Sequence, residues 1–369
     1  MTTPTATTST TTSTTTSTTT STTTTSVAPS GGTAGVARDH PSGSDADRAG
    51  TVLAVTELVT EFKTRRGPVR AVDGVSFTVP ARGVLAVIGE SGSGKSAMLR
   101  SLIGINPPTT KITGGISLQG RDLLALPAKE RRHVRGRDIA MVFQDPLTAL
   151  DPVYTIEKQL VETIRKQHPG LGRDQARRRS LELLELVQIP SAGSRLKAYP
   201  NELSGGMRQR VVIAMAIAGR PQVLLADEPT TALDVTVQAR MMRLFRDIQQ
   251  EIGMAMIVVT HDLGVAAELA DDVAVMYAGR FVERGRAQEI LLRPNHPYTE
   301  GLIEANVRAG QGHRPLAIPG TPPSLTRLPP GCAFAPRCRY AVAGCWEQPA
   351  PIHGTDQHWS RCLLAADAA

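Results

Sequence analysis

The chain has 369 residues, a formal net charge of +7 and a hydrophobic content of 41%. A chain of this length can bury a full core and is expected to hold one large domain with appendages. No apolar run reaches the length that a membrane span needs; the best candidate, Val211 to Ala218, ends at Gly219 and suits a buried helix. The composition therefore predicts a protein that is soluble by itself and that needs a partner for any role at a membrane.

The basic residues include two runs of arginine, Arg131-Arg132 and Arg177-Arg178-Arg179. A nucleic-acid surface is one interpretation of such runs, and a solvated helix face is the other. No aromatic residues alternate with these arginines, as they do where single-stranded nucleic acid stacks. We favour the solvated helix face, and no nucleic-acid partner is expected.

The first 50 residues differ in composition from the rest. Residues 2–26 are nearly all Thr and Ser, and the stretch up to about Gly50 stays rich in Gly, Ser, Ala and Asp. Such a segment has too few apolar side chains to offset the entropy of ordering, so 1–50 is predicted to be disordered. It also lacks a charged start followed by an apolar core, so a secretory signal is not expected.

Regular structure is predicted to begin at Val52. Short strands are expected over 52–55 and 58–62, followed by a turn over 64–68 and further strand over 69–79 with a break at Asp73-Gly74. These segments indicate a small antiparallel sheet.

The next part of the chain alternates between buried strands and helices. Continuous apolar runs predict strands at 84–88, 139–143, 223–226 and 256–260, with helices at 97–103, 204–218 and 235–251. This alternation is typical of an α/β protein with a parallel sheet covered by helices. A mostly helical insertion is expected at about 145–205, and a hairpin at 273–283. We place the main domain at 51–293 and a separate C-terminal extension at 294–369, where Pro, Gly and Cys increase.

A glycine-rich loop follows the first buried strand directly. It reads Gly89-Glu90-Ser91-Gly92-Ser93-Gly94-Lys95-Ser96 and precedes a predicted helix. Glycines let several backbone N–H groups point at one anion, to which the helix adds its positive end. Lys95 would supply charge to the outer phosphates, and the Ser96 hydroxyl would join a Mg²⁺ shell. The alternative, a flexible Gly/Ser turn, is disfavoured by the strand–loop–helix context.

Polar side chains follow three further buried strands. Asp227 and Glu228 end the run that begins at Val223, while Gln144 and His261 come directly after two others. Ligand sites in such sheets lie beyond the strand ends. A carboxylate there holds Mg²⁺ through water, and a second one polarises an attacking water. Each residue alone would be an ordinary strand-end contact, but together with the loop they indicate nucleotide hydrolysis.

A third string identifies the class of hydrolase. Leu203-Ser204-Gly205-Gly206-Met207-Arg208-Gln209-Arg210 resembles the signature sequence of ABC-type ATPases. From about Val52 to Leu292 the chain is similar to an ABC-transporter ATP-binding subunit, a P-loop NTPase with a parallel core sheet, a small antiparallel β subdomain and a helical insertion.

The resemblance implies ATP and Mg²⁺ as ligands and gives each motif a role. Gly89 to Ser96 would be the Walker A loop, and Ser96, Gln144 and Asp227 would serve Mg²⁺. Glu228 would be the catalytic base, with His261 as the switch histidine and Gln144 as the Q-loop glutamine. Asp234 would belong to the D-loop with Ala232 and Leu233, and Phe62 would stack on adenine.

The signature also implies a dimer. In this family two ATP molecules lie between two subunits, so Ser204, Gly205, Gly206 and Gln209 would serve the nucleotide held by the partner's Walker loop. The active unit is therefore expected to be a pair of nucleotide-binding domains.

Further strings narrow the resemblance to dipeptide/oligopeptide importers. They lie at 143–152, 199–203, 227–238, 295–299 and 318–323. Such a subunit would sit on the cytoplasmic face of two membrane permeases, pair with a related but distinct ATPase, and serve an external solute-binding protein indirectly. Nickel and opine importers share much of the pattern. A soluble ABC ATPase acting on DNA or ribosomes is an alternative of another class, and a purely regulatory module is a third.

All four cysteines, Cys332, Cys338, Cys345 and Cys362, lie in the C-terminal segment. In an intracellular protein such clustering favours a metal over disulfides, although the spacing matches neither a zinc ribbon nor the bacterial ferredoxin run. The peptide-importer ATPases carry a similar pattern, and some hold a [4Fe–4S] cluster there. A [4Fe–4S] cluster is the first expectation, Zn²⁺ the second, and four reduced structural cysteines the third.

Overall fold

The computed structural model describes residues 50–65, 67–230, 234–310 and 318–368. The predicted disorder of residues 1–50, apart from Gly50, lies outside these ranges, as do Ala232 and Leu233 of the predicted D-loop. Within the described ranges, no helix is both long enough and apolar enough to cross a bilayer.

A small antiparallel sheet forms first, as the sequence predicts. Among the described residues it has four strands in the order β2-β1-β4-β5, namely β1 (Thr51–Thr64), β2 (Gly67–Pro80), β4 (Lys111–Leu118) and β5 (Arg121–Asp122). The expected interruptions in the first two strands are absorbed as irregularities, because the register shifts between Val55 and Leu58. Glu57 there has a φ of 46°, and Gly74 has a φ of 70°. The strands therefore bulge and continue where the sequence predicted breaks.

The main sheet carries the site. In the described ranges its eight strands follow the order β11-β12-β10-β9-β3-β8-β7-β6. The parallel part comprises β6 (Ile139–Val142), β7 (Val223–Asp227), β8 (Ala255–Thr260), β3 (Val84–Ile88) and β9 (Asp272–Tyr277). The antiparallel edge comprises β10 (Arg280–Arg286), β12 (His358–Ser360) and β11 (His353–Thr355). The C-terminal residues thus extend the same sheet that holds the phosphate loop.

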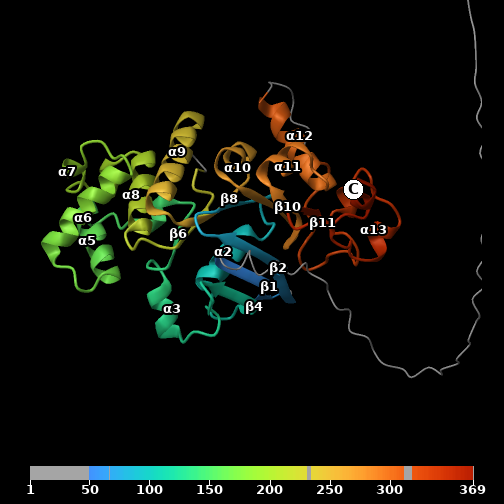
Figure 1. Cartoon of the computed structure of the whole chain (residues 1–369), viewed down its shortest axis with the longest axis horizontal. Helices are drawn as coiled ribbons and strands as arrows, with labels where there is room; N and C mark the ends of the chain where they lie inside the picture. Colours follow the sequence, from blue (N-terminus) through green and yellow to red (C-terminus); the bar gives the residue numbers. More distant parts are fainter. Residues whose placement is uncertain (1–49, 66, 231–233, 311–317, 369) are drawn as a thin grey trace, which may run out of the picture. The chain divides into compact units, whose positions relative to one another are not determined.

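Helices cover this sheet and form the predicted insertion (Figure 1). Their bounds are α2 (Lys95–Ile103), α3 (Ala128–Val134), α4 (Pro146–Ala149), α5 (Ile156–Gln167), α6 (Arg173–Leu186), α7 (Ala192–Arg195), α8 (Gly205–Ile217), α9 (Val235–Ile252), α10 (Leu263–Leu269), α11 (Ala287–Leu292), α12 (Pro297–Gly310) and α13 (Gly344–Glu347). Short 3₁₀ turns are η1 (Pro200–Glu202), η2 (Ala335–Arg337) and η3 (Leu363–Ala368). Figure 1 shows α5 and α6 beyond α8 near the β6 edge, and α13 near β11 at the opposite edge.

Side-chain caps define where the helices of the site begin. The Ser204 hydroxyl accepts a hydrogen bond from the Met207 N–H, and α8 starts directly after it, as predicted. Asp234 caps α9 by accepting from the Val237 N–H at 2.9 Å. Such caps satisfy backbone donors that have no partner in the first helical turn.

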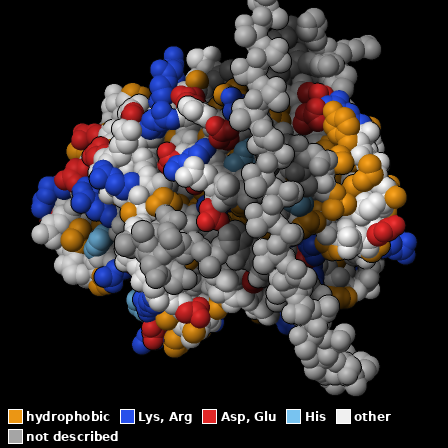
Figure 2. Space-filling model, turned by 45° about the vertical axis from the view of Figure 1, so that its right-hand side comes forward, with side chains coloured by type: hydrophobic (Ala, Val, Ile, Leu, Met, Phe, Trp, Pro, Cys, Tyr) orange, Lys and Arg blue, Asp and Glu red, His pale blue; other side chains and the backbone are white. Residues whose placement is uncertain are grey.

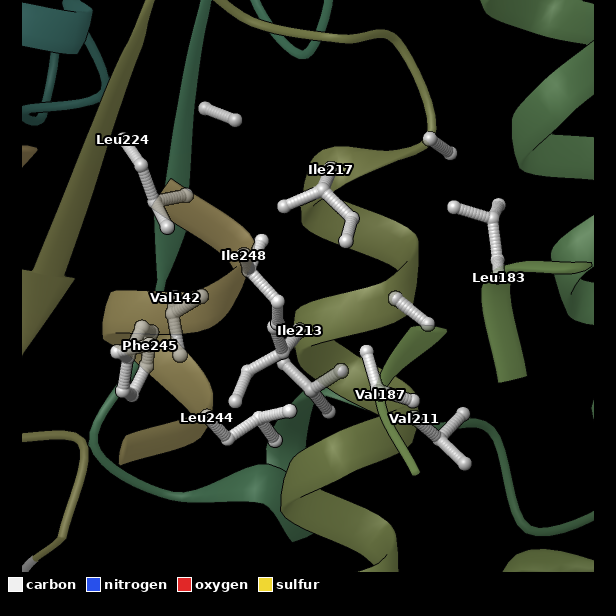
Figure 3. Close-up of a cluster of buried hydrophobic side chains, with 14 of the residues drawn as sticks. Val142, Leu183, Val187, Val211, Ile213, Ile217, Leu224, Leu244, Phe245 and Ile248 are labelled. Carbon is white, nitrogen blue, oxygen red and sulfur yellow. The ribbon is translucent and has the colours of Figure 1, made fainter. Parts of the chain in front are cut away.

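An aliphatic core joins the insertion to the main sheet (Figure 3). Ile213 and Ile217 on α8 are fully buried, and they lie between Val142 and Leu224 of the sheet on one side and Leu183 of α6 on the other. Burying one such side chain contributes roughly 1.5–3 kcal/mol to folding. The insertion is therefore held to the sheet chiefly by apolar contact.

The C-terminal segment packs differently. Its core joins Tyr277 of β9, Tyr298 of α12 and Phe334, with ring centroids 4.5 to 5.3 Å apart. Large apolar side chains are also exposed here, among them Tyr340, Val342 and Trp346. Apolar side chains gather on the right-hand face of Figure 2, where this segment comes forward.

Candidate functional site

The glycine-rich loop lies between β3 and α2, in the strand–loop–helix setting that the sequence predicts. Gly94 has a φ of 109°, and a Cβ there would lie 2.1 Å from the Ala71 carbonyl oxygen of β2. Gly89 is equally constrained, because its Cβ would lie 2.2 Å from the Met276 carbonyl oxygen. Only glycine therefore fits at either position, because each lies against the backbone of a neighbouring strand. The loop leads directly into the N-terminus of α2, whose first N–H groups face it.

Lys95 stays inside the loop that precedes it. Its ammonium donates hydrogen bonds to the carbonyl oxygens of Gly89 at 2.7 Å and Glu90 at 2.9 Å. Burial lowers the pKa of Lys95, although nearby carboxylates oppose the shift. A buried cation at the positive end of a helix is stabilised by an anion, so this group is suited to contact phosphate oxygens.

Ser96 and Asp227 meet across the start of α2 and the end of β7. The Ser96 hydroxyl donates to Asp227 Oδ1 at 2.8 Å. Asp227 is 3% exposed, and burial raises its pKa above the ordinary value. A divalent cation would stabilise the charged carboxylate that burial disfavours. Hydroxyl and carboxylate oxygens are also the ligands that Mg²⁺ prefers, so these two residues fit a magnesium site.

Two of the predicted strand-end residues, Gln144 and His261, meet at one carboxylate oxygen of a third, Glu228. Glu228 Oε2 accepts a hydrogen bond from Gln144 Nε2 at 3.2 Å and lies 3.3 Å from His261 Nδ1. The carboxyl ends of β6, β7 and β8 bring them together, as parallel neighbours do. Glu228 has a φ of 46°, which an L-residue rarely adopts. The left-handed turn aims this carboxylate at the side chains from both neighbouring strands.

Comparison with known proteins gives a second line of argument. Residues 72–231 match the ABC transporter family, and residues 282–345 match the oligopeptide/dipeptide transporter C-terminal region. The oligopeptide transport ATP-binding protein OppD of Bacillus subtilis is 46% identical over 327 residues, which are 87% of this chain and 91% of OppD. The dipeptide transport ATP-binding protein DppD of the same organism is 47% identical over 317 residues, 85% of this chain and 94% of DppD.

The chain belongs to the ATP-binding proteins of ABC transporters. A solved structure agrees: a dimeric post-hydrolysis state of the ATP-binding cassette MJ0796, bound to ADP and Pi, matches with a TM-score of 0.57 at 28% identity. That match covers 64% of this chain and 98% of the cassette. The fold and the ATPase class predicted from the motifs are therefore confirmed, while the assignment of the glycine-rich loop as the Walker A loop stays a prediction.

The predicted signature, residues 203–210, directly follows η1 and enters α8. No hydrogen bond recorded for the described residues joins Ser204, Gly205 or Gly206 to residues 89–96. Gly205 is exposed, and a Cβ there would meet nothing within 4 Å. Gln209 is 2% exposed, and its buried Nε2 has no hydrogen-bond partner among the residues that the structure describes. Nothing in the described part of the chain therefore requires glycine at 205.

Two predicted ATP-site residues, Phe62 and Asp234, are described through contacts near their own positions in the chain. Phe62 lies in β1 opposite Val69 of β2, close to the turn between these strands, and is half-buried. Asp234 caps α9 through Val237. These contacts test neither the stacking role of Phe62 nor the D-loop role of Asp234, and both stay predictions. The two remaining D-loop residues fall outside the described ranges.

The four cysteines are free thiols in the C-terminal segment. The Cys332 N–H donates to the Cys345 carbonyl oxygen at 2.7 Å, and burial raises the pKa of Cys332, Cys338 and Cys362. Within the described ranges, no three His, Cys, Asp or Glu side chains are grouped as a metal site. The thiols are near neighbours, but they are not arranged as ligands, and the expected metal centre has no support from this geometry.

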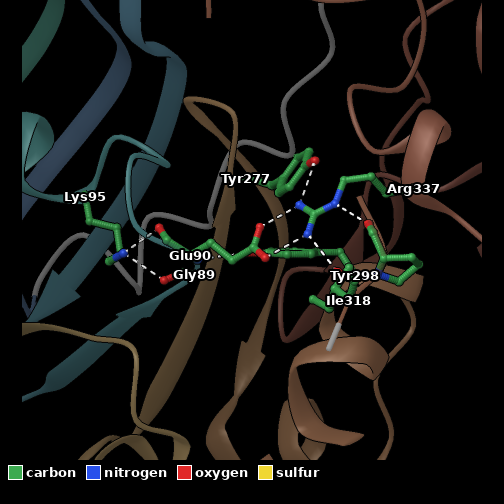
Figure 4. Close-up of polar contacts among 8 residues, drawn as sticks. Gly89, Glu90, Lys95, Tyr277, Tyr298, Ile318 and Arg337 are labelled. Atoms are coloured by element: carbon green, nitrogen blue, oxygen red, sulfur yellow. Dashed lines mark hydrogen bonds and ion pairs between the residues drawn. The ribbon is translucent and has the colours of Figure 1, made fainter. Parts of the chain in front are cut away.

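The sequence did not predict that the C-terminal segment reaches the Walker A loop. Arg337 contacts the Glu90 carboxylate, and the Tyr298 hydroxyl accepts the Glu90 N–H (Figure 4). A pocket beside the loop is lined by Gly89 and His261 together with Leu302 and Asn306 of the C-terminal segment. The string around Tyr298 was recognisable from the family resemblance, but no sequence signal links Arg337 to a residue 247 positions away.

Proposed function

We propose that this ABC ATPase powers a membrane importer of dipeptides or oligopeptides. The observation that carries this proposal is the combination, in one chain, of a complete set of ATP-site motifs with the oligopeptide/dipeptide transporter C-terminal region. OppD and DppD, at 46% and 47% identity, bear names for oligopeptide and dipeptide transport. The chain would act from the cytoplasmic face of the membrane, through two permease subunits, with a solute-binding protein on the other side.

Glu228 is proposed to polarise the water that attacks the γ-phosphate. Its Oε2 atom receives the Gln144 amide and lies next to the His261 ring, and this holds the carboxylate at the end of β7. A positioned carboxylate acts as a general base where it reaches the attacking water. His261, whose side chain is 59% exposed, is free to contact the terminal phosphate from the next strand.

Ser96, Asp227 and Gln144 are proposed to hold Mg²⁺. The 2.8 Å contact between Ser96 and Asp227 supports the first two, and Gln144 lies at the adjacent strand end. When bound, Mg²⁺ would neutralise charge on the outer phosphate oxygens. Lys95 and the N–H groups of the Walker A loop would bind the same phosphates from the other side.

The signature is proposed to serve ATP held by a second, related ATPase subunit. Gly205 is exposed, and a Cβ there would meet no atom of the described residues within 4 Å, so those residues do not require glycine at this position. A phosphate approaching the N-terminus of α8 from outside would explain that choice, because the helix presents unpaired N–H groups at this end. Ser204, Gly206 and the buried amide of Gln209 would complete this half-site.

The four cysteines are proposed to hold a [4Fe–4S] cluster, with Zn²⁺ as the alternative. The occurrence of all four cysteines within residues 332–362 supports the proposal. The thiols would have to move closer together to bind a metal, because they are not grouped as ligands in the described part of the chain. The test is iron, sulfide and zinc content per chain after anaerobic purification, for wild type and Cys345→Ser. About four irons and four sulfides in wild type, lost in the variant, is the expected result. A preparation with none of these elements would overturn both assignments.

Peptide import is tested by uptake in the native host. Cells that lack the chain receive either wild type or Glu228→Gln, and uptake of labelled dipeptides and tetrapeptides is measured beside nickel uptake. We expect wild type alone to restore peptide uptake. Restoration of nickel uptake only would identify a metal importer. Recovery of the tagged chain with ribosomes or DNA and without permeases would replace transport by a soluble role.

A further inference from the structure

Arg337 is a buried cation that the ATP-site motifs do not include. Its side chain is 4% exposed and lies at the end of η2, directly before Cys338. Its guanidinium donates to Glu90 Oε2 at 2.6 Å and to Glu90 Oε1 at 2.8 Å (Figure 4). It also donates to the Pro319 carbonyl oxygen at 2.9 Å. This paired, two-oxygen geometry is the strong form of an arginine–carboxylate contact.

Tyr298 holds the backbone of the same glutamate. Its hydroxyl oxygen accepts the Glu90 N–H at 2.7 Å, and the ring is completely buried against Tyr277 and Phe334. The Arg337 guanidinium contacts the Tyr277 hydroxyl at 3.3 Å. The contacts that Arg337 and Tyr298 make to Glu90 are therefore supported by one cluster of packed aromatic rings. Rigid support of this kind keeps a polar contact in one geometry.

Glu90 connects this aromatic cluster to the rest of the Walker A loop. It lies between Gly89 and Ser91, and its carbonyl oxygen accepts a hydrogen bond from the Lys95 ammonium at 2.9 Å. The position of Glu90 is thus set on one side by Lys95 and on the other by Tyr298 and Arg337. A shift of Glu90 would move both the lysine and the neighbouring N–H groups that face phosphate.

The negative charge of Glu90 also affects how the loop binds phosphate. A carboxylate within a loop built to bind phosphate repels that phosphate, at a cost that depends on distance and local dielectric. Hydrogen bonding to Glu90 is the main cause that raises the pKa of Arg337, so the guanidinium stays charged at every relevant pH. The pair presents the loop with little net charge, whereas Glu90 alone would present a full negative charge.

We propose that Arg337 is a positioning residue of the ATP site, which increases ATP affinity by holding and neutralising Glu90 from the C-terminal segment. The proposal rests on the proposed binding of ATP phosphates by the Walker A loop. It makes the C-terminal segment part of the nucleotide site as well as a mark of the transporter class. Because Arg337 precedes Cys338, displacement of the cysteine segment also acts on the loop.

The test is a double-mutant cycle on the full-length chain, with ATP affinity measured directly by titration and KM and kcat measured in turnover. Arg337→Gln is expected to raise the ATP Kd and KM on the order of tenfold, since it leaves the Glu90 charge uncompensated beside the phosphates. Glu90→Gln/Arg337→Gln is expected to restore most of that loss, since both charges are gone. Arg337→Lys keeps the positive charge but cannot make the paired contact with both carboxylate oxygens of Glu90. Its ATP Kd and KM are expected to lie between those of wild type and Arg337→Gln.

Arg339→Gln is the matched control. Arg339 is two positions away and 46% exposed, and it pairs with Glu300 and Glu304 of α12 without contacting the loop. Its KM should equal that of wild type. Wild-type KM in Arg337→Gln, or a double variant as impaired as Arg337→Gln, would overturn the proposal. A wild-type chain that neither binds nor hydrolyses ATP would refute the nucleotide site itself.

Tyr298→Phe keeps the proposal testable if Arg337→Gln does not fold. The change removes one hydroxyl from a buried ring and leaves the packing intact. Loss of the acceptor for the Glu90 N–H is expected to raise the KM for ATP about threefold with little change in kcat. An unchanged KM in Tyr298→Phe together with an unchanged KM in Arg337→Lys would contradict the proposed coupling.

Discussion

The two flanks of the ATP site are held to it by different kinds of side-chain contact. On the flank with α5, α6 and α8, aliphatic side chains such as Leu183, Ile213 and Ile217 fill the contact with the sheet. On the flank with α12 and the cysteines, aromatic rings surround buried polar groups. Among the described residues, the buried Lys, Arg, Asp and Glu residues are Lys95 and Asp227 at the site and Glu283 and Arg337 on the C-terminal flank.

This difference separates stability from nucleotide affinity. Apolar contact stabilises without direction, so the helical flank can be weakened while the loop keeps its shape. The C-terminal flank contacts the loop through directional, charged hydrogen bonds, so changes there are expected to alter ATP binding. The predictions below test this separation, starting from the largest effect.

Glu228→Gln tests the chemistry that lies between the two flanks. Removing the proposed base is expected to lower kcat by about 10²–10⁴-fold, while ATP binding and the free energy of unfolding stay close to wild type. The measurement is single-turnover ATP hydrolysis beside a binding titration. Turnover near the wild-type rate would show that another group activates the water.

Gly205→Asp tests whether the helical flank acts on a second subunit. A Cβ at this position meets nothing within 4 Å among the described residues, and an acidic residue favours a helix N-terminus by ~0.5 kcal/mol. The fold and ATP binding should therefore persist. A carboxylate at a phosphate site of the dimer is expected to lower steady-state hydrolysis at least about tenfold. Wild-type hydrolysis in Gly205→Asp would contradict the shared site.

Ile213→Ala tests the aliphatic flank. Ile213 is completely buried among α8, α6 and the sheet, and truncating such a residue costs about 2–5 kcal/mol. Denaturant unfolding should show this loss, while the KM for ATP of the folded protein stays unchanged. The control is Leu292→Ala, because Leu292 is 78% exposed and its truncation should change stability by less than about 0.5 kcal/mol.

His296 tests the C-terminal flank through pH. His296 is 1% exposed, and its ring Nδ1 accepts the backbone N–H of Tyr298 at 3.0 Å. The backbone N–H of His296 donates to the Glu283 carboxylate at 3.1 Å. Burial lowers the pKa of His296 from 6.5 to about 4, against the opposing effect of Glu283. Between these values the unfolded chain takes up a proton that the folded chain does not. Stability from this group is thus complete above pH 6.5 and falls as the pH drops toward 4.

The expected loss over that interval is about 3 kcal/mol, from the shift at 1.36 kcal/mol per pH unit. His296→Asn supplies a carbonyl acceptor for the Tyr298 N–H and does not titrate. Unfolding free energies measured from pH 7 to pH 4 should therefore fall less steeply in the variant. Parallel curves for wild type and His296→Asn would show that His296 titrates normally in the folded chain.

Much of the site could be predicted because its signals are local. The strand 84–88 is apolar at every position, and the predicted bounds agree with β3. Gln144, Glu228 and His261 were expected together because parallel strands end at one edge, and the structure places all three around one oxygen. The helix predicted from Ser204 likewise begins at a local cap, because the Ser204 hydroxyl accepts the Met207 N–H.

The remainder depended on tertiary contact. The breaks predicted near Leu58 and at Gly74 were wrong because pairing between β1 and β2 continues through bulges. The strands β11 and β12 are three residues each and exist through pairing with β10. The contact between Arg337 and Glu90 spans 247 positions, and neither neighbourhood indicates the other.

The most direct test compares the two flanks side by side. Unfolding free energy and ATP Kd are measured for wild type, Ile213→Ala and Arg337→Gln in one buffer. The account predicts that Ile213→Ala loses about 2–5 kcal/mol of stability with wild-type ATP affinity, whereas Arg337→Gln weakens ATP binding on the order of tenfold. If Arg337→Gln loses only stability, or if Ile213→Ala weakens ATP binding equally, the C-terminal segment has no distinct role in the nucleotide site.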